Sequence, residues 1–269
     1  MAFPETLDSV EVIHSMNWQE LRSPQIGALA RDTIVVLPTA AIEQHGPHLP
    51  VGTDSFISEA VASALDRDFD GKLLVLPVQR LGCSEHHMAY AGSLTLRHET
   101  FEHVVMEALA SMVRQKLRRF LILNGHGGNQ SVGGLIAEKA SINWPDVQVV
   151  FTSWWMIAAD RLGKLVEGAF PSVGHACEFE TSLMLALRPE LVDMTLAVDD
   201  GLPLVSRLLQ FDLIKGAAAR LSRPMHRMTK HGVYGRATLG SAEKGHRILQ
   251  ETVAALHELI VTCWPDDAS

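Results

Sequence analysis

The stretch TIVVLPTAAIEQHGPHLPVGTD, residues 33–54, joins an apolar run, a stiff loop and the start of a helix. The run over 33–38 is short and rich in β-branched residues, which is typical of a buried strand. Pro47 and Pro50 lack the N–H that a helix interior or a central strand requires, so a kinked loop is expected around them. Apolar residues at helical spacing follow over 55–65. At the carboxyl end of the predicted strand, where open α/β sheets bind ligands, the loop presents Glu43, His45, His48 and Asp54 before the helix begins.

The polar residues of this loop also have an ordinary interpretation. Thr53 or Asp54 could be the N-cap of the following helix, and the histidines could be plain loop residues. Two carboxylates and two histidines nevertheless crowd into the twelve residues 43–54, which two prolines and two glycines shape. That crowding favours a functional loop.

The composition excludes several classes of protein. The chain has 269 residues, 47% of them hydrophobic, and we predict a single domain over 1–269. Its net charge of -8 argues against a nucleic-acid or anionic-membrane surface. No apolar run approaches the ~20 residues of a membrane helix, and residues 1–18 lack the pattern of a signal peptide. The three cysteines form no C-x-x-C pair, so we expect reduced thiols and a cytoplasmic protein.

The rest of the chain alternates between predicted strands and helices. Further buried strands are predicted over 73–77, 120–124 and 147–151. Helices are predicted over 98–119, 132–142, 183–187 and 241–263, with shorter ones within 15–30 and 203–209. This alternation predicts parallel strands joined by right-handed crossovers. The predicted fold class is therefore α/β, a single domain with a mostly parallel β-sheet sandwiched between helices.

A glycine-rich turn, Gly125-His126-Gly127-Gly128-Asn129, directly follows the predicted strand over 120–124. A phosphate-binding P-loop would end in Gly-Lys-Ser/Thr, and a dinucleotide loop would read G-x-G-x-x-G, and the turn matches neither pattern. Two interpretations remain. The segment is either a plain tight turn, or it holds a histidine at the end of a strand while its glycines let other groups approach closely.

Two more polar segments, residues 82–93 and 174–182, contain candidate site residues. The second precedes an apolar helix, where acidic residues could simply favour the helix dipole. The first is long enough to be a functional loop, although a solvated surface loop has the same composition. The candidates are His86 and His87 in the first segment and His175, Glu178 and Glu180 in the second.

Three loops at the ends of buried segments thus offer two imidazoles and three carboxylates, namely Glu43, His45, Asp54, His126 and Glu180. One structural zinc would not need so many donors, and no thiolate pair is present. The set suits two divalent ions bridged by an aspartate, because a water between two cations loses its proton near neutral pH. Such a site hydrolyses a polarised carbonyl without a serine or cysteine nucleophile, and neither G-x-S-x-G nor H-E-x-x-H occurs in the chain.

These motifs resemble those of the creatininase (creatinine amidohydrolase) family. The resemblance runs from about residue 10 to the last helix and rests on three segments, 43–54, 124–129 and 175–182. It implies a single α/β domain in a homo-oligomer, often a hexamer. It also implies two divalent ions, zinc or manganese, and a small-molecule substrate.

The resemblance further implies a role for each candidate. One metal is expected on Glu43, Asp54 and His126, and the other on His45, Asp54 and Glu180, with Asp54 as the bridge. His175 matches a histidine that carries a proton beside the bridging water, a role that suits an imidazole. We expect the loop over 82–93 to line the substrate pocket, and we name His87 and Trp154 as candidate substrate contacts.

The chain departs from creatininase itself at positions that bear on the substrate. Gly128 stands where creatininase has a glutamate, and His86 replaces another glutamate of the family. Trp154 and Trp155 come earlier in the chain than creatininase's substrate-holding tryptophans, and Phe170-Pro171 occupies the nearby segment. Relatives with the Gly-His-Gly-Gly-Asn form act instead on formamide groups of pyrimidine nucleotides, on a C-terminal dipeptide of a redox-cofactor precursor, or on cyclic keto-inositols.

The leading hypothesis is therefore a two-metal amidohydrolase that cleaves a C–N bond of a small polar, cyclic amide through a bridging hydroxide. The alternative uses the same metals on a peptide or a cyclic ketone, because the pocket walls decide specificity. A non-catalytic binding protein and a nucleotide-binding module are weaker alternatives. We expect His48 to fix its loop by a hydrogen bond and assign no role to His86, Glu178 or residues 191–240.

Overall fold

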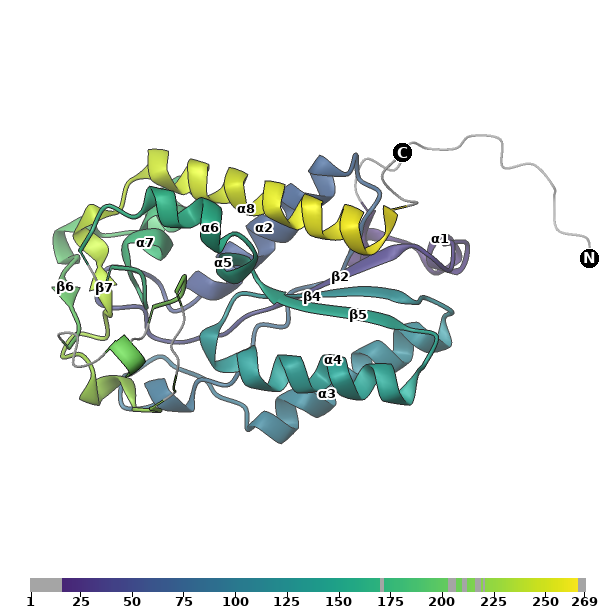
Figure 1. Cartoon of the computed structure of the whole chain (residues 1–269), viewed down its shortest axis with the longest axis horizontal. Coiled ribbons are helices and arrows are strands. Elements are labelled where there is room, and N and C mark those ends of the chain that lie inside the picture. Colours follow the sequence, from purple (N-terminus) through teal and green to yellow (C-terminus); the bar gives the residue numbers. More distant parts are fainter. Residues whose placement is uncertain are drawn as a thin grey trace, which may run out of the picture.

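A parallel five-stranded sheet forms the centre of the molecule, with strand order β1-β3-β2-β4-β5 (Figure 1). The computed structural model describes residues 16–169, 172–202, 207–209, 212–215, 219 and 221–265. The strands are β1 (Met16–Asn17), β2 (Ile34–Thr39), β3 (Leu74–Val75), β4 (Arg119–Asn124) and β5 (Gln148–Ser153). A second sheet pairs β6 (Asp199–Asp200) with β7 (Gly235–Arg236) in antiparallel fashion.

Helices cover both faces of the central sheet (Figure 1). On one face lie α2 (Thr53–Asp68), α5 (Trp154–Ile157), α6 (Ala159–Leu162), α7 (Glu178–Leu187) and α8 (Ala242–Cys263), and on the other lie α3 (His98–Arg114) and α4 (Gln130–Asn143). Neighbouring residues of a strand point to opposite faces, so Val36 and Leu121 pack with the first group of helices while Val35 and Phe120 pack with the second. The strands are therefore buried on both sides, as their continuous apolar runs predict.

Short connecting elements complete the described fold. Helix α1 spans Ser23–Gly27, and 3₁₀ helices span Trp18–Glu20, Glu85–His87, Gly127–Asn129, Gly163–Leu165, Pro189–Leu191, Met194–Leu196, Arg207–Leu209, Met225–Arg227 and Ala237–Leu239. No helix in the described part of the chain is long and apolar enough to cross a bilayer. The predicted short helix over 203–209 falls partly outside the described residues, and its described part, 207–209, is 3₁₀.

The predicted α/β class, its parallel sheet and most of its helices are confirmed, but several boundaries differ from the predicted ones. Helix α2 begins at Thr53, so Asp54 lies in its first turn and not in the loop before it. Helix α3 ends at Arg114, well short of the predicted residue 119. Lys116 adopts a left-handed φ of 71°, which turns the chain, and Arg119 already belongs to β4. The basic residues over 114–119 suited a helix terminus, but only Arg114 belongs to the helix, and the others lie in the turn and at the start of β4.

Strand β3 is also shorter than the predicted 73–77, with only two residues in regular pairing. The proline at 77 cannot donate a backbone hydrogen bond. Beyond it, the Gln79 N–H donates to the Pro38 carbonyl oxygen, and the chain stays beside β2 as far as the Thr39 bridge. This path brings the loop over 82–93 to the carboxyl edge of the sheet.

Candidate metal centre

The carboxyl ends of β2 and β4 hold the predicted metal ligands close together. β2 leads into the loop that contains Glu43 and His45, and α2 follows that loop with Asp54 in its first turn. β4 leads through Gly125 to His126, and α7 contributes Glu180 from its first turn. All the predicted donors and the predicted proton carrier are buried: Glu43, His45, Asp54, His126, Glu180 and His175.

Asp54 lies between the two imidazoles. Its Oδ2 is 3.1 Å from Nδ1 of His126, and its Oδ1 is 3.1 Å from Nε2 of His45. Glu43 Oε1 lies 3.3 Å from the same His126 nitrogen, and Glu180 Oε1 lies 3.8 Å from the same His45 nitrogen. One aspartate therefore faces two half-sites, each made of one imidazole and one further carboxylate.

Several of these buried atoms have no hydrogen-bond partner. They are Glu43 Oε2, His45 Nε2 and Asp54 Oδ2. Glu43 Oε2 also has no ion pair among the described residues, and such a buried carboxylate oxygen is strongly unfavourable unless a cation or a donor meets it. Donor atoms of Glu43, His45 and Asp54 lie within 4.8 Å of one another, as do those of His45, His175 and Glu180. Carboxylate and imidazole donors at such separations fit divalent cations.

Hydrogen bonds fix which nitrogen of each imidazole faces the cluster. Nδ1 of His45 donates to the Glu43 backbone oxygen at 3.1 Å, which leaves Nε2 facing Asp54. Nε2 of His126 donates to the Cys83 backbone oxygen at 3.1 Å, which leaves Nδ1 toward the carboxylates. Metal-binding histidines are usually oriented in this way by a second hydrogen bond.

The turn that contains His126 is held by its neighbours. The Asn124 side chain accepts from the His126 N–H at 3.1 Å and donates to the His126 carbonyl oxygen at 2.8 Å. Gly125 passes so close to Ser58 that an added Cβ would collide with the serine hydroxyl. The glycines therefore permit the close approach of β4 and α2 that brings His126 to Asp54.

His175 lies at the edge of the cluster, with Nδ1 3.6 Å from Glu43 Oε1. Its Nε2 donates to the backbone oxygen of Gln44 at 2.7 Å, so Nδ1 is the nitrogen left to exchange a proton. Paired backbone hydrogen bonds with Tyr234 hold the histidine in place. Burial, reinforced by the neighbouring His45, lowers the pKa of His175 and favours a neutral imidazole.

The carboxylates strongly affect the other two imidazoles. Burial opposes a charged imidazole, but Glu43 and Asp54 outweigh it and raise the pKa of His126 to about 10. Asp54 and Glu180 likewise hold the pKa of His45 well above its ordinary value, again against burial. In the metal-free protein, these shifts favour protonated imidazoles beside the carboxylates.

Gln44 belongs to this cluster, although the sequence analysis did not single it out. Its side-chain Nε2 lies 2.8 Å from Nδ1 of His87 and 3.2 Å from the Gly232 oxygen. His87, a predicted substrate contact, lies with Nε2 3.4 Å from Glu43 Oε1. In the sequence, Gln44 could have been recognised from its position between the predicted ligands Glu43 and His45.

The other residues named from the sequence lie outside the cluster of donors. Trp154 is 1% exposed and packs edge-to-face on Trp155 within the hydrophobic core, so its substrate contact stays a prediction without support from its position. His48 forms a hydrogen bond of 2.8 Å with Thr181, which ties its loop to α7 as predicted. Glu178 pairs with Lys244 instead of joining the cluster. Phe170-Pro171 falls outside the described residues.

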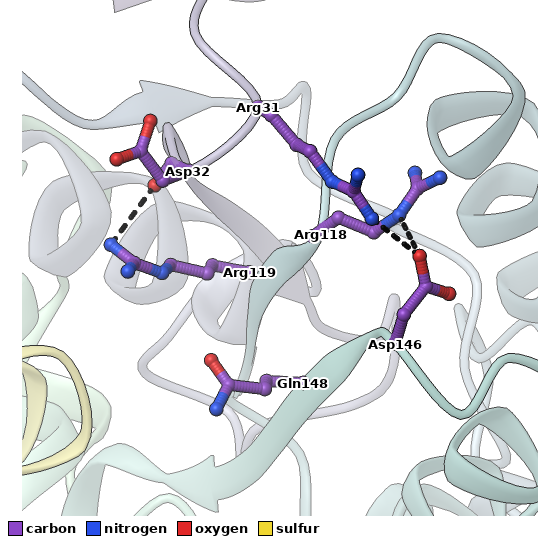
Figure 2. Close-up of a pocket in the computed structure, with 6 residues that line it drawn as sticks. All are labelled: Arg31, Asp32, Arg118, Arg119, Asp146 and Gln148. Carbon is purple, nitrogen blue, oxygen red and sulfur yellow. Dashed lines mark hydrogen bonds and ion pairs between the residues drawn. The ribbon is translucent and has the colours of Figure 1, made fainter.

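A hollow of about 470 Å³ lies at the opposite, amino-terminal edge of the sheet (Figure 2). Arg31 and Arg118 both pair there with Asp146, and Arg119 donates to the Asp32 backbone oxygen. Its lining is Arg31, Asp32, Arg118, Arg119, Asp146 and Gln148. Two of the arginines share one aspartate there, whereas the buried donors gather at the other edge, so we place the candidate site at the carboxyl edge.

A buried set of carboxylates and imidazoles at the carboxyl edge of a parallel α/β sheet is the kind of site that metal-dependent hydrolases use. The sequence model for creatininase, described as creatinine amidohydrolase, matches residues 14–260. The chain belongs to the creatininase family and is a hydrolase.

Three curated relatives are similar over most of their length. A creatinine amidohydrolase of Pseudomonas putida is 26% identical over 92% of this chain and 95% of its own. A 3-dehydro-scyllo-inosose hydrolase of Thermotoga maritima is 26% identical over 84% of this chain and 76% of its own. A mycofactocin precursor peptide peptidase of Mycobacterium ulcerans is 29% identical over 86% of this chain and 90% of its own.

Solved creatininase structures share the fold. A crystal structure of creatinine amidohydrolase superposes with a TM-score of 0.77 and 26% identity, covering 93% of this chain and 98% of its own. The structure described as creatininase Mn gives a TM-score of 0.75, and a mutant creatininase of the Zn-Zn type gives 0.78, both with 26% identity over 93% of this chain and 99% of their own.

Proposed function

We propose that this protein is a two-metal hydrolase that cleaves a C–N bond of a small polar, cyclic amide. The observation that carries the proposal is the position of Asp54, whose two oxygens face imidazoles on opposite sides at equal distances of 3.1 Å. Glu43, Asp54 and His126 would hold one divalent ion, and His45, Asp54 and Glu180 the other. The zinc and manganese forms of creatininase make these two metals the first to test.

The proposed chemistry divides between the ions and the chain. When bound, the ions would polarise the scissile carbonyl and supply hydroxide at neutral pH. His175 would take up a proton at Nδ1 and pass it to the leaving nitrogen. The backbone oxygen of Gln44 would hold Nε2, the other ring nitrogen, in place. Burial of the donors keeps bulk water away and strengthens every charge interaction in the site.

The second candidate uses the same site on another bond. The three relatives are named for activity on creatinine, an inosose and a precursor peptide. Their sequence identities with this chain, 26–29%, are too similar to favour one of these activities. Gly128 argues against creatinine itself, because a Cβ there would collide with the Cys83 oxygen and the His126 ring. The glutamate expected of creatininase at that place has no room here.

The decisive experiment begins with metal analysis of purified protein, which we expect to give two divalent ions per chain. Chelation should abolish hydrolysis, and zinc or manganese should restore it. A library of cyclic amides, short peptides and cyclic ketones, assayed with one metal at a time, then separates the two candidates. Turnover that survives complete metal removal would refute the proposal, and two bound ions without any turnover would favour a binding protein.

Two finer expectations accompany this proposal. Family resemblance favours a homo-oligomer, such as a hexamer, located in the cytoplasm. Light scattering on the purified protein tests the first expectation, and a monomeric mass would contradict it. Fractionation of the source cells tests the second.

A further inference from the structure

His86 lies beside the proposed metal site without belonging to its predicted donors. It sits in the 3₁₀ helix Glu85–His87, and its ring stacks on that of His126 with centroids 5.7 Å apart and planes at 20°. A ring nitrogen of His86 lies within 4.8 Å of donor atoms of Glu43 and His126. Donor atoms that share one ion through bonds of about 2.1 Å lie closer together than this, so binding would draw the His86 ring toward the other two donors.

His86 is also the imidazole of this group whose nitrogens have no partner among the described residues. The other imidazoles of the group each have a ring nitrogen hydrogen-bonded to Glu43, Gln44 or Cys83. His86 makes only ring contacts, with His87 on one side and His126 on the other. A half-buried imidazole in that situation remains available to coordinate a cation.

The turn that follows His126 cannot supply a metal donor in place of His86. Gly127 and Gly128 follow the histidine without side chains, and a Cβ at Gly128 would collide with the Cys83 oxygen. The loop over 82–93 passes over this gap, anchored where the Cys83 N–H donates to the Asn129 side chain at 3.0 Å. His86 of this loop therefore lies next to the glycine turn, where the turn itself offers no side-chain donor.

We propose that His86 is an additional ligand of the ion held by Glu43, Asp54 and His126. The inference deepens the proposed function and rests on it. Four protein donors would then surround this ion, with a further position left for water or substrate. Because an imidazole is neutral, the added donor leaves more of the positive charge of the ion to act on a substrate carbonyl than a carboxylate would.

The test uses the metal-free full-length protein titrated with cobalt(II), whose visible absorption reports its ligands. We expect wild type to bind two ions. His86→Ala should bind one of them about 10- to 100-fold more weakly and show an altered band. His86→Gly with added imidazole should recover the wild-type band. His103→Ala, which removes an exposed histidine of α3, is the matched control and should behave as wild type.

The outcomes separate this inference from the function on which it rests. Unchanged cobalt affinity and spectrum in His86→Ala would overturn the ligand role, and a loss of activity in the same variant would then indicate a substrate contact. Failure of imidazole to restore the band in His86→Gly would also count against coordination. If wild type itself bound no cobalt, the two-metal function would fail, and that result is visible before any variant is made.

Discussion

The side-chain Nε2 of Gln44 lies 2.8 Å from Nδ1 of His87. An amide nitrogen can only donate, so Nδ1 of His87 accepts, and the ring proton must sit on Nε2, which faces Glu43 Oε1 at 3.4 Å. The backbone oxygen of the same glutamine accepts from Nε2 of His175. One residue therefore sets the tautomer of two histidines around Glu43.

Gln44→Leu should lower kcat by about 10- to 100-fold while both metal ions stay bound, because the amide orients His87 without being a ligand itself. The variant keeps the backbone oxygen that holds His175. Activity assays with parallel metal analysis make the measurement. Gln115→Leu, an exposed glutamine at the end of α3, is the control. Loss of metal in Gln44→Leu, or unchanged kcat, would contradict the positioning role.

Metal binding at pH 7 should release protons from the imidazole ligands in wild type. Without metal, Glu43 and Asp54 raise the pKa of His126 to about 10 against the effect of burial, and Asp54 and Glu180 raise that of His45. His126 is then protonated at pH 7, the shift of His45 favours its protonated form, and an ion must displace such protons. Affinity should therefore increase as the pH rises from 7 toward 10, while the number of protons released decreases.

Calorimetric titration in two buffers of different ionisation enthalpy counts the released protons. His126→Ala should release fewer protons than wild type on binding metal, and the control His103→Ala should release as many protons as wild type. A binding enthalpy that does not depend on the buffer would show that the imidazoles are already neutral in the metal-free protein.

The strands and most helices could be predicted because their residues satisfy local rules. The apolar runs that became β2 and β4 are short and bounded by turns, which favours a strand buried on both faces. Since parallel strands end at the same edge, the residues after those strands, Glu43 and His126, could be expected to meet. Asp54 lies beside His126 and His45 even though its helix begins earlier than predicted.

The contribution of the loop over 82–93 could not be derived in the same way. Its place is fixed by contacts between distant parts of the chain, such as Cys83 with Asn129 and Tyr90 with Thr229. Such contacts leave no periodicity in the sequence. The same holds for Gln44, whose amide meets His87 and Gly232 only after folding.

Asp54→Ala should lose both metal ions, because its two oxygens face both half-sites. Glu180→Ala should lose or weaken only the ion on the His45 side, since Glu180 lies near that imidazole. Metal content by atomic emission, compared between the two variants, makes the distinction. An Asp54→Ala protein that retains its full metal content would refute the bridging role, and equal losses in both variants would show that the two half-sites do not bind independently.

Glu178 and Lys244 form a buried ion pair of 2.6 Å that joins the start of α7 to the start of α8. The carboxylate has further donors in the backbone N–H groups of Glu167, at 2.9 Å, and Gly168, at 3.3 Å, and in the Ser172 hydroxyl. The ammonium has fewer alternatives, a hydrogen bond to the Leu239 oxygen at 2.9 Å and the largely exposed Glu167 carboxylate at 3.1 Å. The two members of the pair are therefore not equivalent.

Glu178→Leu should cost about 3–5 kcal/mol of unfolding free energy, because it leaves a buried ammonium without its main partner. Lys244→Met should cost less, about 1–3 kcal/mol, since the carboxylate keeps three donors. Arg80→Met, which breaks the exposed pair with Glu59, is the control and should cost no more than about 1 kcal/mol. Urea unfolding measures all three, and the double variant at 178 and 244 should recover part of the loss. If Lys244→Met proved the more damaging single change, the carboxylate and not the ammonium would be the member that depends on the pair.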